Sequence, residues 1–216
     1  MTTAKDTVKI NNVLISCYDK TGLKYFAAEL AKINPDVRIY CSSGTFNELK
    51  KAVAAANLLE ISEYTGTKEM PVGLVKTLHP KIHSGILADL NDREQLKYLE
   101  ENKAVAFDLA VVNLYPFSTA AKEGAIEKAR MNIDIGGVSL IEAAAKNFLR
   151  VAVIVSPVDY EKVLEELKKN KGGCNIDTRL RLAKAAMGYL SAYIGNISNY
   201  YDRLTTAAVK KEYKVE

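Results

Sequence analysis

The feature that most constrains the fold is an alternation of short apolar runs with longer amphipathic stretches. The apolar runs, rich in β-branched residues, predict strands at 12–18, 37–41, 58–62, 107–115 and 151–156. The amphipathic stretches predict helices at 23–33, 45–56, 93–102, 125–132, 138–148, 159–170 and 178–204. A bend in the last helix at Gly188 or Gly195 is left open. Continuous apolar strands that alternate with helices predict an α/β fold, a mostly parallel sheet covered by helices on both faces.

Length and composition predict one domain in a reducing compartment. We predict a single domain over 12–204, a flexible N-terminus over 1–11 and a polar C-terminal tail over 205–216 that frays. Three cysteines without framework spacing, no apolar signal segment and no membrane-spanning run favour a cytoplasmic protein with no membrane partner. The net charge of +4 is too small, and basic runs too few, to indicate a nucleic-acid partner.

Small and hydroxylic residues follow the first two predicted strands. Ligands of parallel sheets bind at the carboxyl ends of the strands, where DKTG (19–22) and SSGT (42–45) each precede a helix. Unpaired N–H groups at a helix N-terminus favour an anion, and Lys20 adds a full positive charge. Alternatively, Thr21 and Thr45 are ordinary N-caps. The residues alone leave the two interpretations even, and neither a Walker A loop nor GxGxxG is present.

Further polar groups follow the later strands. NLYPF (113–117) comes after the longest strand candidate, and NIDIGG (132–137) comes directly before a helix. Paired glycines there would let a substrate approach the backbone N–H groups closely. The stretch 63–85 is long, irregular and too apolar for free disorder, which indicates a functional loop. Lys146, taken alone, is an ordinary lysine at a helix C-terminus.

Both histidines of the chain lie in VKTLHPKIHSG (75–85). A zinc-type pair needs both on one helix face, but Pro80 disfavours helical geometry at His79 and suits the first turn of a helix. We therefore expect His79 outside the helix and His83 inside it. One capping and one packed histidine is the favoured interpretation, and no metal site is predicted.

Taken together, these motifs resemble one family. The chain is similar to IMP cyclohydrolase, the N-terminal half of the bifunctional AICAR transformylase/IMP cyclohydrolase. The residues that carry the resemblance are ISCYDKTGL (15–23), SSGT (42–45), VKTLHPKIHSGIL (75–87), VVNLYPF (111–117), NIDIGGVSLIEAAAKN (132–147) and SAYIGNISNYYDRL (191–204). They occur in family order over roughly 12–204, nearly the whole chain.

The resemblance implies a fold, a reaction and a set of partners. The implied fold is methylglyoxal-synthase-like. The implied reaction is dehydrative ring closure of 5-formamidoimidazole-4-carboxamide ribonucleotide (FAICAR) to IMP, the last step of purine synthesis, without metal or organic cofactor. The resemblance leaves open a stand-alone enzyme or an excised domain, a homodimer with its own interface, and coupling to a separate AICAR formyltransferase.

The resemblance also implies roles for particular residues. The catalytic positions are Lys76, Tyr115, Asp134 and Lys146. Asp134 would be a base or would orient the base, the two lysines would stabilise charge, and Tyr115 would donate a hydrogen bond. The substrate-binding positions are Ser16, Lys20, Ser42, Gly44, Thr45, Thr77, Asn113, Gly136 and Gly137. A direct role for His79 stays open.

The chain departs from the family pattern at four positions. Leu74 stands where the family usually has arginine, Tyr18 where a small serine is common, Ser43 where SGGT has glycine, and Phe148 where histidine is common. Leucine cannot replace a bidentate donor, so we expect the departures to affect substrate affinity more than chemistry. Two alternatives remain, a non-catalytic nucleotide-binding regulatory domain and a methylglyoxal synthase. Retention of Lys76, Tyr115, Asp134 and Lys146 argues against the regulatory domain, and KTLHP and DIGG argue against the synthase.

Overall fold

A five-stranded parallel sheet forms the centre of the molecule. The computed structural model describes residues 4–68, 70 and 74–215. In spatial order the strands are β4 (Leu58–Glu60), β3 (Arg38–Cys41), β2 (Asn12–Cys17), β5 (Leu109–Asn113) and β6 (Ala152–Ile154). All four neighbouring pairs are parallel. The predicted α/β class and parallel sheet are confirmed.

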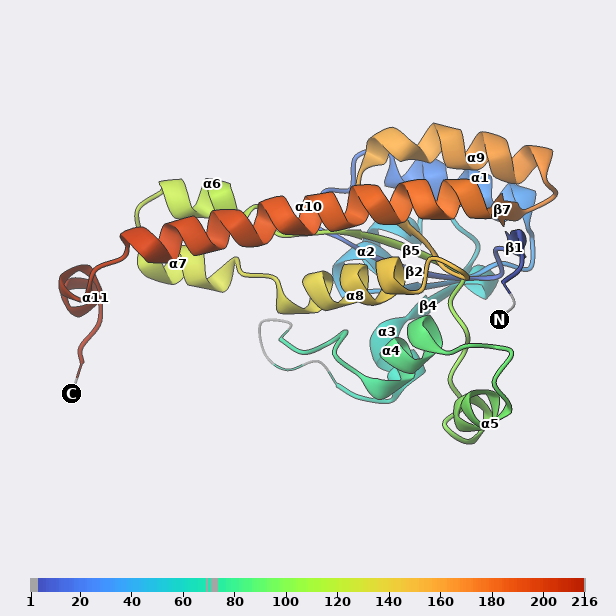
Figure 1. The fold of residues 1–216 in the computed structure, drawn as a ribbon, viewed down its shortest axis with the longest axis horizontal. Coiled ribbons are helices and arrows are strands. Elements are labelled where there is room, and N and C mark those ends of the chain that lie inside the picture. Colours follow the sequence, from blue (N-terminus) through green and yellow to red (C-terminus); the bar gives the residue numbers. More distant parts are fainter. Residues whose placement is uncertain (1–3, 69, 71–73, 216) are drawn as a thin grey trace.

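Helices cover both faces of the sheet, as the continuous apolar strands require. Along β2, Val13 and Ile15 join one buried cluster and Leu14 joins the other, because successive side chains point to opposite faces. The first face is covered by α1 (Leu23–Ile33), α2 (Ser43–Leu49) and α9 (Tyr160–Lys169). The second is covered by α4 (Pro80–Leu87), α8 (Ile135–Lys146) and α10 (Ile176–Arg203) (Figure 1).

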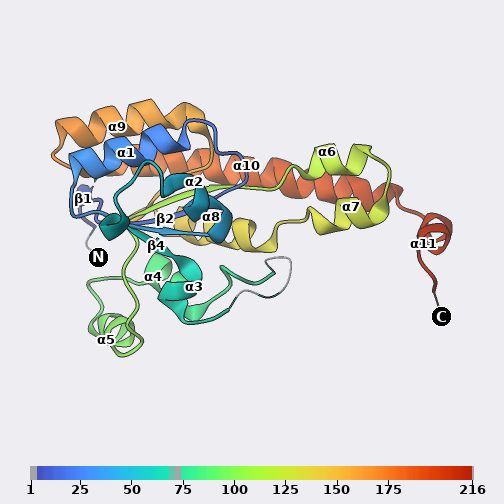
Figure 2. The same ribbon diagram turned by 180° about the vertical axis from the view of Figure 1, so that it is seen from behind.

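An arm extends from this body. The second half of α10 leaves the sheet and runs between α6 (Phe117–Lys122) and α7 (Ile126–Met131), with α11 (Thr206–Glu212) beyond them (Figures 1 and 2). α10 is one helix of 28 residues, and both views show no sharp kink along it. α5 (Arg93–Glu101) lies at the opposite end of the molecule from the arm.

Both termini are more ordered than the sequence predicts. β1 (Thr7–Lys9) pairs antiparallel with β7 (Gly173–Asn175), and the buried Arg179 guanidinium donates to the carbonyls of Lys5 and Asp6. At the other end, the Glu212 carboxylate accepts the first N–H groups of α7. The predictions of a flexible 1–11 and a frayed 205–216 are therefore wrong for 5–9 and 206–212. Residues 1–3 and 216 lie outside the described residues.

Some predicted boundaries are also wrong. The helix expected over 45–56 ends at Leu49, and a short 3-10 turn at Ala55–Asn57 precedes β4. The strand expected over 58–62 stops at Glu60, where α3 (Ile61–Thr65) begins. α6 was not predicted, and a 3-10 turn at Pro157–Asp159 precedes α9. None of the helices in the described part of the chain is both long and apolar enough to cross a membrane.

Candidate active site

A cavity of about 380 Å³ lies at the carboxyl ends of β2, β3 and β5. The loop before α4 and the start of α8 complete its wall. It is lined by Ser16, Cys17, Tyr18, Lys20, Ser42, Gly44, Thr45, Met70, Leu74, Val75, Lys76, Thr77, Leu78, Asn113, Tyr115, Met131, Ile133, Asp134, Ile135, Gly136 and Gly137. Of the predicted site residues, all but Lys146 lie in this wall. Segments more than 100 residues apart in sequence therefore meet where a parallel sheet presents its ligands.

One end of the cavity carries a connected set of hydroxyl groups. The Ser16 hydroxyl lies 3.4 Å from that of Ser42, which lies 3.2 Å from that of Thr45. The ammonium of Lys20 donates to the carbonyl of Tyr18 at 3.2 Å and lines the same end. Several hydroxyl donors beside one cation can hold a phosphate.

The alternative that Thr21 and Thr45 are N-caps is wrong. The N-cap of α1 is Gly22, in a left-handed conformation with φ of 69°, and that of α2 is Ser42; neither side chain caps its helix. The Thr45 hydroxyl is buried and instead accepts the N–H of Cys17 at 3.3 Å, which ties α2 to the end of β2.

Asp134, the N-cap of α8, also lines the cavity. Its carboxylate accepts the N–H of Gly137 at 2.7 Å. Burial raises the pKa of this carboxyl above its usual value, and hydrogen bonds from the backbone of Gly137 and Tyr115, then the charge of Lys76, offset part of the rise. A carboxylate with a raised pKa that faces a cavity is suited to accept a proton.

The paired glycines line the cavity and also lie close to the protein's own side chains, and the approach of a substrate to their N–H groups stays a prediction. A Cβ on Gly136 would lie 2.5 Å from the hydroxyl oxygen of Thr77, and one on Gly137 would lie 2.5 Å from Leu114 and 2.8 Å from the Asp134 carboxylate. These glycines therefore make room for the protein's own side chains. They let the loop that carries Thr77 lie directly against the start of α8.

Asn113 and Tyr115 follow β5 and differ in what they offer a ligand. The Asn113 amide is engaged on both sides, since it accepts the Asp19 N–H and donates to the Asp19 carbonyl, each at 2.8 Å. Asn113 thus holds the DKTG turn in place while it also lines the cavity, and its substrate contact stays a prediction. Tyr115 is 37% exposed and packs edge-on against Tyr18, with ring centroids 5.5 Å apart.

Lys76 enters the cavity wall from a turn before α4. The preceding residue, Val75, has a positive φ of 55°, which is rare for a β-branched residue and typical of strained functional sites. Leu74, where the resemblance leads us to expect arginine, is 48% exposed at the rim. Other exposed apolar side chains that line the cavity are Met70, Met131 and Ile135.

Lys146 is not brought into this site. It ends α8, whereas Asp134 caps the start of the same helix, so about 18 Å of helix separates them. Its side chain is exposed and does not line the cavity. The inference from the resemblance that Lys146 acts beside Asp134 therefore finds no support in this geometry.

The histidines take the predicted positions. His79 is the N-cap of α4, and its Nδ1 accepts the N–H of Lys81 at 3.1 Å, while His83 lies within α4, with Nε2 3.3 Å from the Ser139 hydroxyl. Burial, and then the charge of Lys81, lower the pKa of His79. Within the described ranges, no three acidic, histidine or cysteine side chains gather as a metal site would require.

Two residues that contact the site segments were missed. Tyr189 and Tyr193 of α10 accept the backbone N–H groups of Leu114 and Asp134. Tyrosines four residues apart share a helix face, which is the signal that could have found them. The cavity-lining Cys17 was also not singled out; burial raises the pKa of its thiol to about 12, so it is not a nucleophile at neutral pH.

Known proteins resemble this chain over nearly its whole length. Residues 22–139 match the family of MGS-like domains, and residues 144–216 match the AICARFT/IMPCHase bienzyme family. The bifunctional purine biosynthesis protein PurH of Bradyrhizobium diazoefficiens (strain JCM 10833 / BCRC 13528 / IAM 13628 / NBRC 14792 / USDA 110) is 44% identical over 198 residues, 90% of this chain and 36% of that protein. The crystal structure of ForH superposes with a TM-score of 0.72 and 26% identity, covering 89% of this chain and 99% of that one.

The first of these matches spans more than half of the chain. The chain therefore belongs to the MGS-like domain family, and its fold is the one that the sequence predicts. It also spans only about a third of the length of the PurH protein that it resembles.

Proposed function

We propose that this member of the MGS-like family is an IMP cyclohydrolase, which closes the ring of FAICAR to give IMP and water. The observation that carries the proposal is the pairing, in one cavity, of a hydroxyl cluster beside Lys20 with a half-buried carboxylate whose pKa is affected by the charge of Lys76. The similarity to PurH, a purine biosynthesis protein, supports the same reaction class.

The hydroxyl end suits the 5′-phosphate of the nucleotide. Ser16, Ser42 and Thr45 would donate hydrogen bonds, and Lys20 would supply charge. Gly44 has no atom within 4 Å of the place where a Cβ would be, so the start of α2 is open to a ligand there. With the phosphate at this end, the heterocycle would extend toward Thr77, Asp134 and Gly136.

For ring closure the protein has to transfer protons, and it has little need to bring the reacting groups together. The carboxamide nitrogen attacks the formyl carbon of the same molecule, so the reacting groups are already connected. A bond forms between that nitrogen and that carbon, and the formyl oxygen leaves as water. The water takes one proton from the carboxamide nitrogen and one from the formamido nitrogen. The protein must therefore accept a proton, stabilise an oxyanion and return a proton to the leaving oxygen.

Asp134 is the group best placed to accept the proton, because burial raises its pKa and makes it a stronger base than a solvated carboxylate. Lys76, which lies close enough to lower that pKa, would stabilise the developing oxyanion. The exposed hydroxyl of Tyr115 would donate a hydrogen bond to the same oxygen or to the departing water.

The proposal is tested by following FAICAR closure through ultraviolet absorbance with folded, purified protein. Turnover above the uncatalysed rate is expected. Tight IMP binding without turnover would contradict the proposal and favour a nucleotide-binding regulatory domain.

A methylglyoxal synthase is the second candidate, favoured by the MGS-like match over residues 22–139. The similarity of residues 144–216 to the AICARFT/IMPCHase bienzyme argues against it. Release of methylglyoxal and phosphate from a triose phosphate, with no FAICAR closure, would support this candidate.

We also propose that the chain is functionally coupled to a formyltransferase, which would supply FAICAR. Faster formation of IMP by the two proteins together than their separately measured rates allow would support this coupling.

A further inference from the structure

Two backbone N–H groups beside the candidate catalytic side chains lie outside regular structure. Leu114 follows the last residue of β5 and directly precedes Tyr115. Asp134 is the N-cap of α8, in an extended conformation with φ of −92° and ψ of 91°. Neither N–H can be satisfied by a strand ladder or by its own helix, and backbone donors that are buried need a partner.

Both partners come from one face of α10. The Leu114 N–H donates to the Tyr189 hydroxyl at 3.1 Å, and the Asp134 N–H donates to the Tyr193 hydroxyl at 2.9 Å. The Tyr193 hydroxyl in turn donates to the carbonyl of Asn132 at 3.0 Å. The Tyr193 hydroxyl therefore links the Asn132 carbonyl to the Asp134 N–H and holds the turn that orients the Asp134 carboxylate.

We propose that Tyr189 and Tyr193 are positioning residues that hold the segments carrying Tyr115 and Asp134 in one fixed arrangement at the active site. They act through the backbone and are not expected to touch the substrate. The inference rests on the proposed function, because it assigns Tyr115 and Asp134 to the ring-closing chemistry.

The two phenols are well suited to this task. Tyr193 is 8% exposed and packs against Phe117, and Tyr189 packs against the same buried cluster, so each ring has little freedom to turn. Burial raises the pKa of both hydroxyls, that of Tyr193 to about 12, and the charge of Asp134 raises both further. Both hydroxyls therefore stay protonated near neutral pH, and α10, a 28-residue helix packed on the sheet, supplies a rigid base.

The pairing of one tyrosine with one amide allows a specific test. In Tyr193→Phe, we expect the amide of Asp134 to exchange with solvent faster, measured by NMR hydrogen exchange, while that of Leu114 is unchanged. In Tyr189→Phe the pattern should reverse. Both substitutions keep the ring and remove only the hydroxyl, and a thermal melt verifies that each variant is folded. Tyr201→Phe is the matched control, because Tyr201 lies on the same helix, is 50% exposed and packs on Tyr200.

Kinetics separates positioning from a merely structural role. For Tyr193→Phe we expect kcat for FAICAR closure to fall by about 10- to 100-fold while the dissociation constant for IMP changes by less than about threefold, since a displaced base costs rate more than ground-state binding. Wild-type kcat in Tyr193→Phe, or unchanged exchange at Asp134, would overturn the proposal. If the wild-type chain closes no ring, the proposed function fails, and the exchange rates alone then decide whether the tyrosines hold the two segments.

Discussion

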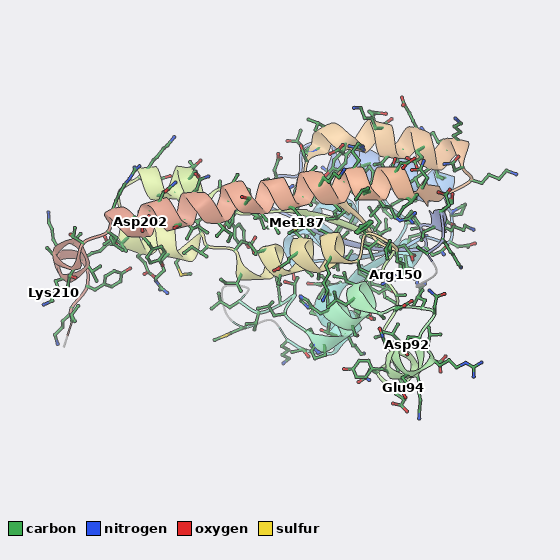
Figure 3. All side chains as sticks on the ribbon, viewed as in Figure 1. Asp92, Glu94, Arg150, Met187, Asp202 and Lys210 are labelled. Carbon is green, nitrogen blue, oxygen red and sulfur yellow. The ribbon has the colours of Figure 1, made fainter. Side chains whose placement is uncertain are left out.

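Each end of the parallel sheet holds a carboxylate near a cation, the buried Asp108 at one end and the half-buried Asp134 at the other, and the two carboxylates have different partners. At the amino end, Asp108 and Arg150 border a second cavity of about 460 Å³ (Arg150 is labelled in Figure 3). The Arg150 guanidinium donates to the carbonyls of Gly85, Ile86, Ala88 and Phe107. The Asp108 carboxylate accepts the N–H groups of Asn11 and Asn12, both at 2.9 Å. Here both charged groups are hydrogen-bonded to the backbone, and the two side chains also form an ion pair at 3.9 Å.

At the carboxyl ends of the strands, the charged groups of Asp134 and Lys76 keep hydrogen-bonding capacity that a ligand could use. The Asp134 carboxylate accepts the N–H of Gly137 and interacts with the backbone of Tyr115, yet it still lines the cavity. Among the described residues, the Lys76 ammonium has neither a hydrogen bond nor an ion pair. A buried charge whose bonds all go to the backbone stabilises a fold, whereas one that faces a cavity with free capacity can serve a ligand. Four variants test this difference between the two ends of the sheet.

The largest effect is expected from the charges at the carboxyl end. Lys76→Ala and Asp134→Asn should each lower kcat for FAICAR closure by about 10²- to 10⁴-fold, because each removes a group that we propose acts on the transition state. The measurement is ultraviolet absorbance on folded protein, with IMP affinity determined in parallel. Lys146→Ala is the matched comparison and should lose far less turnover than Lys76→Ala. An equal loss in the two lysine variants would place Lys146 in the site after all.

The next effect is on stability at the amino end. Arg150→Met should lower the free energy of unfolding by about 3 kcal/mol, because it leaves several backbone carbonyls without their donor and the Asp108 carboxylate without the cation 3.9 Å away. Urea unfolding measures the loss, and the folded fraction should keep its kcat. The control is Arg130→Met, which removes an exposed pair with Glu127 and should leave stability nearly unchanged. Lost turnover in folded Arg150→Met protein would mean that the two ends are not separate.

A smaller effect is expected at the anion-binding end of the cavity. Lys20→Ala should raise KM for FAICAR by about tenfold and leave kcat nearly unchanged, because a phosphate contact remote from the reacting atoms contributes equally to substrate and transition state. Lys24→Ala, an exposed lysine of α1 that pairs with Glu48, is the control and should change neither parameter. A fall in kcat without a change in KM for Lys20→Ala would refute the phosphate assignment.

The smallest effect concerns pH. Because burial raises the pKa of Asp134 in the folded protein, its ionised form costs stability at neutral pH, and this cost disappears below its pKa in the unfolded chain. Asparagine caps a helix as well as aspartate does, so Asp134→Asn should be more stable than the wild type at pH 7, with the difference vanishing in acid. Unfolding curves across pH measure this. In the wild type, kcat/KM should fall as the pH is lowered through the raised pKa of Asp134, which lies above the range in which an ordinary aspartate titrates. If the midpoint of this fall lay within the ordinary range, Asp134 would not be the base.

Much of the fold could be predicted from sequence because it depends on local patterns. The helix of residues 23–33 was placed with the bounds that the structure has, because its apolar spacing is regular and Gly22 precedes it. β1 and β7 were missed because each has only three residues, and their pairing depends on contacts across more than 160 residues. α6 and α11 were missed for a related reason, since neither has enough apolar residues to show a periodicity.

The candidate site could be predicted in composition but not in arrangement. Strand-end position and motif resemblance selected Lys76, Asp134 and the hydroxyls of 42–45. Neither signal could show that Lys146 lies a whole helix length from Asp134. Nor could either show that the Asn113 amide is hydrogen-bonded to Asp19 in the DKTG turn. Tyr189 and Tyr193 were overlooked because a tyrosine on an amphipathic helix is usually part of the core.

The alternation of strands and helices and the parallel sheet follow from periodicity along the chain, and the polar character of the carboxyl ends of the strands follows from the residues there. Which charged groups are bonded to the backbone, and which remain free in a cavity, can be seen only in the folded molecule. That distinction depends on distances between segments far apart in sequence, such as Arg150 and Gly85, or Tyr193 and Asp134. Such distances are set by how the helices pack on the sheet, which local patterns do not encode.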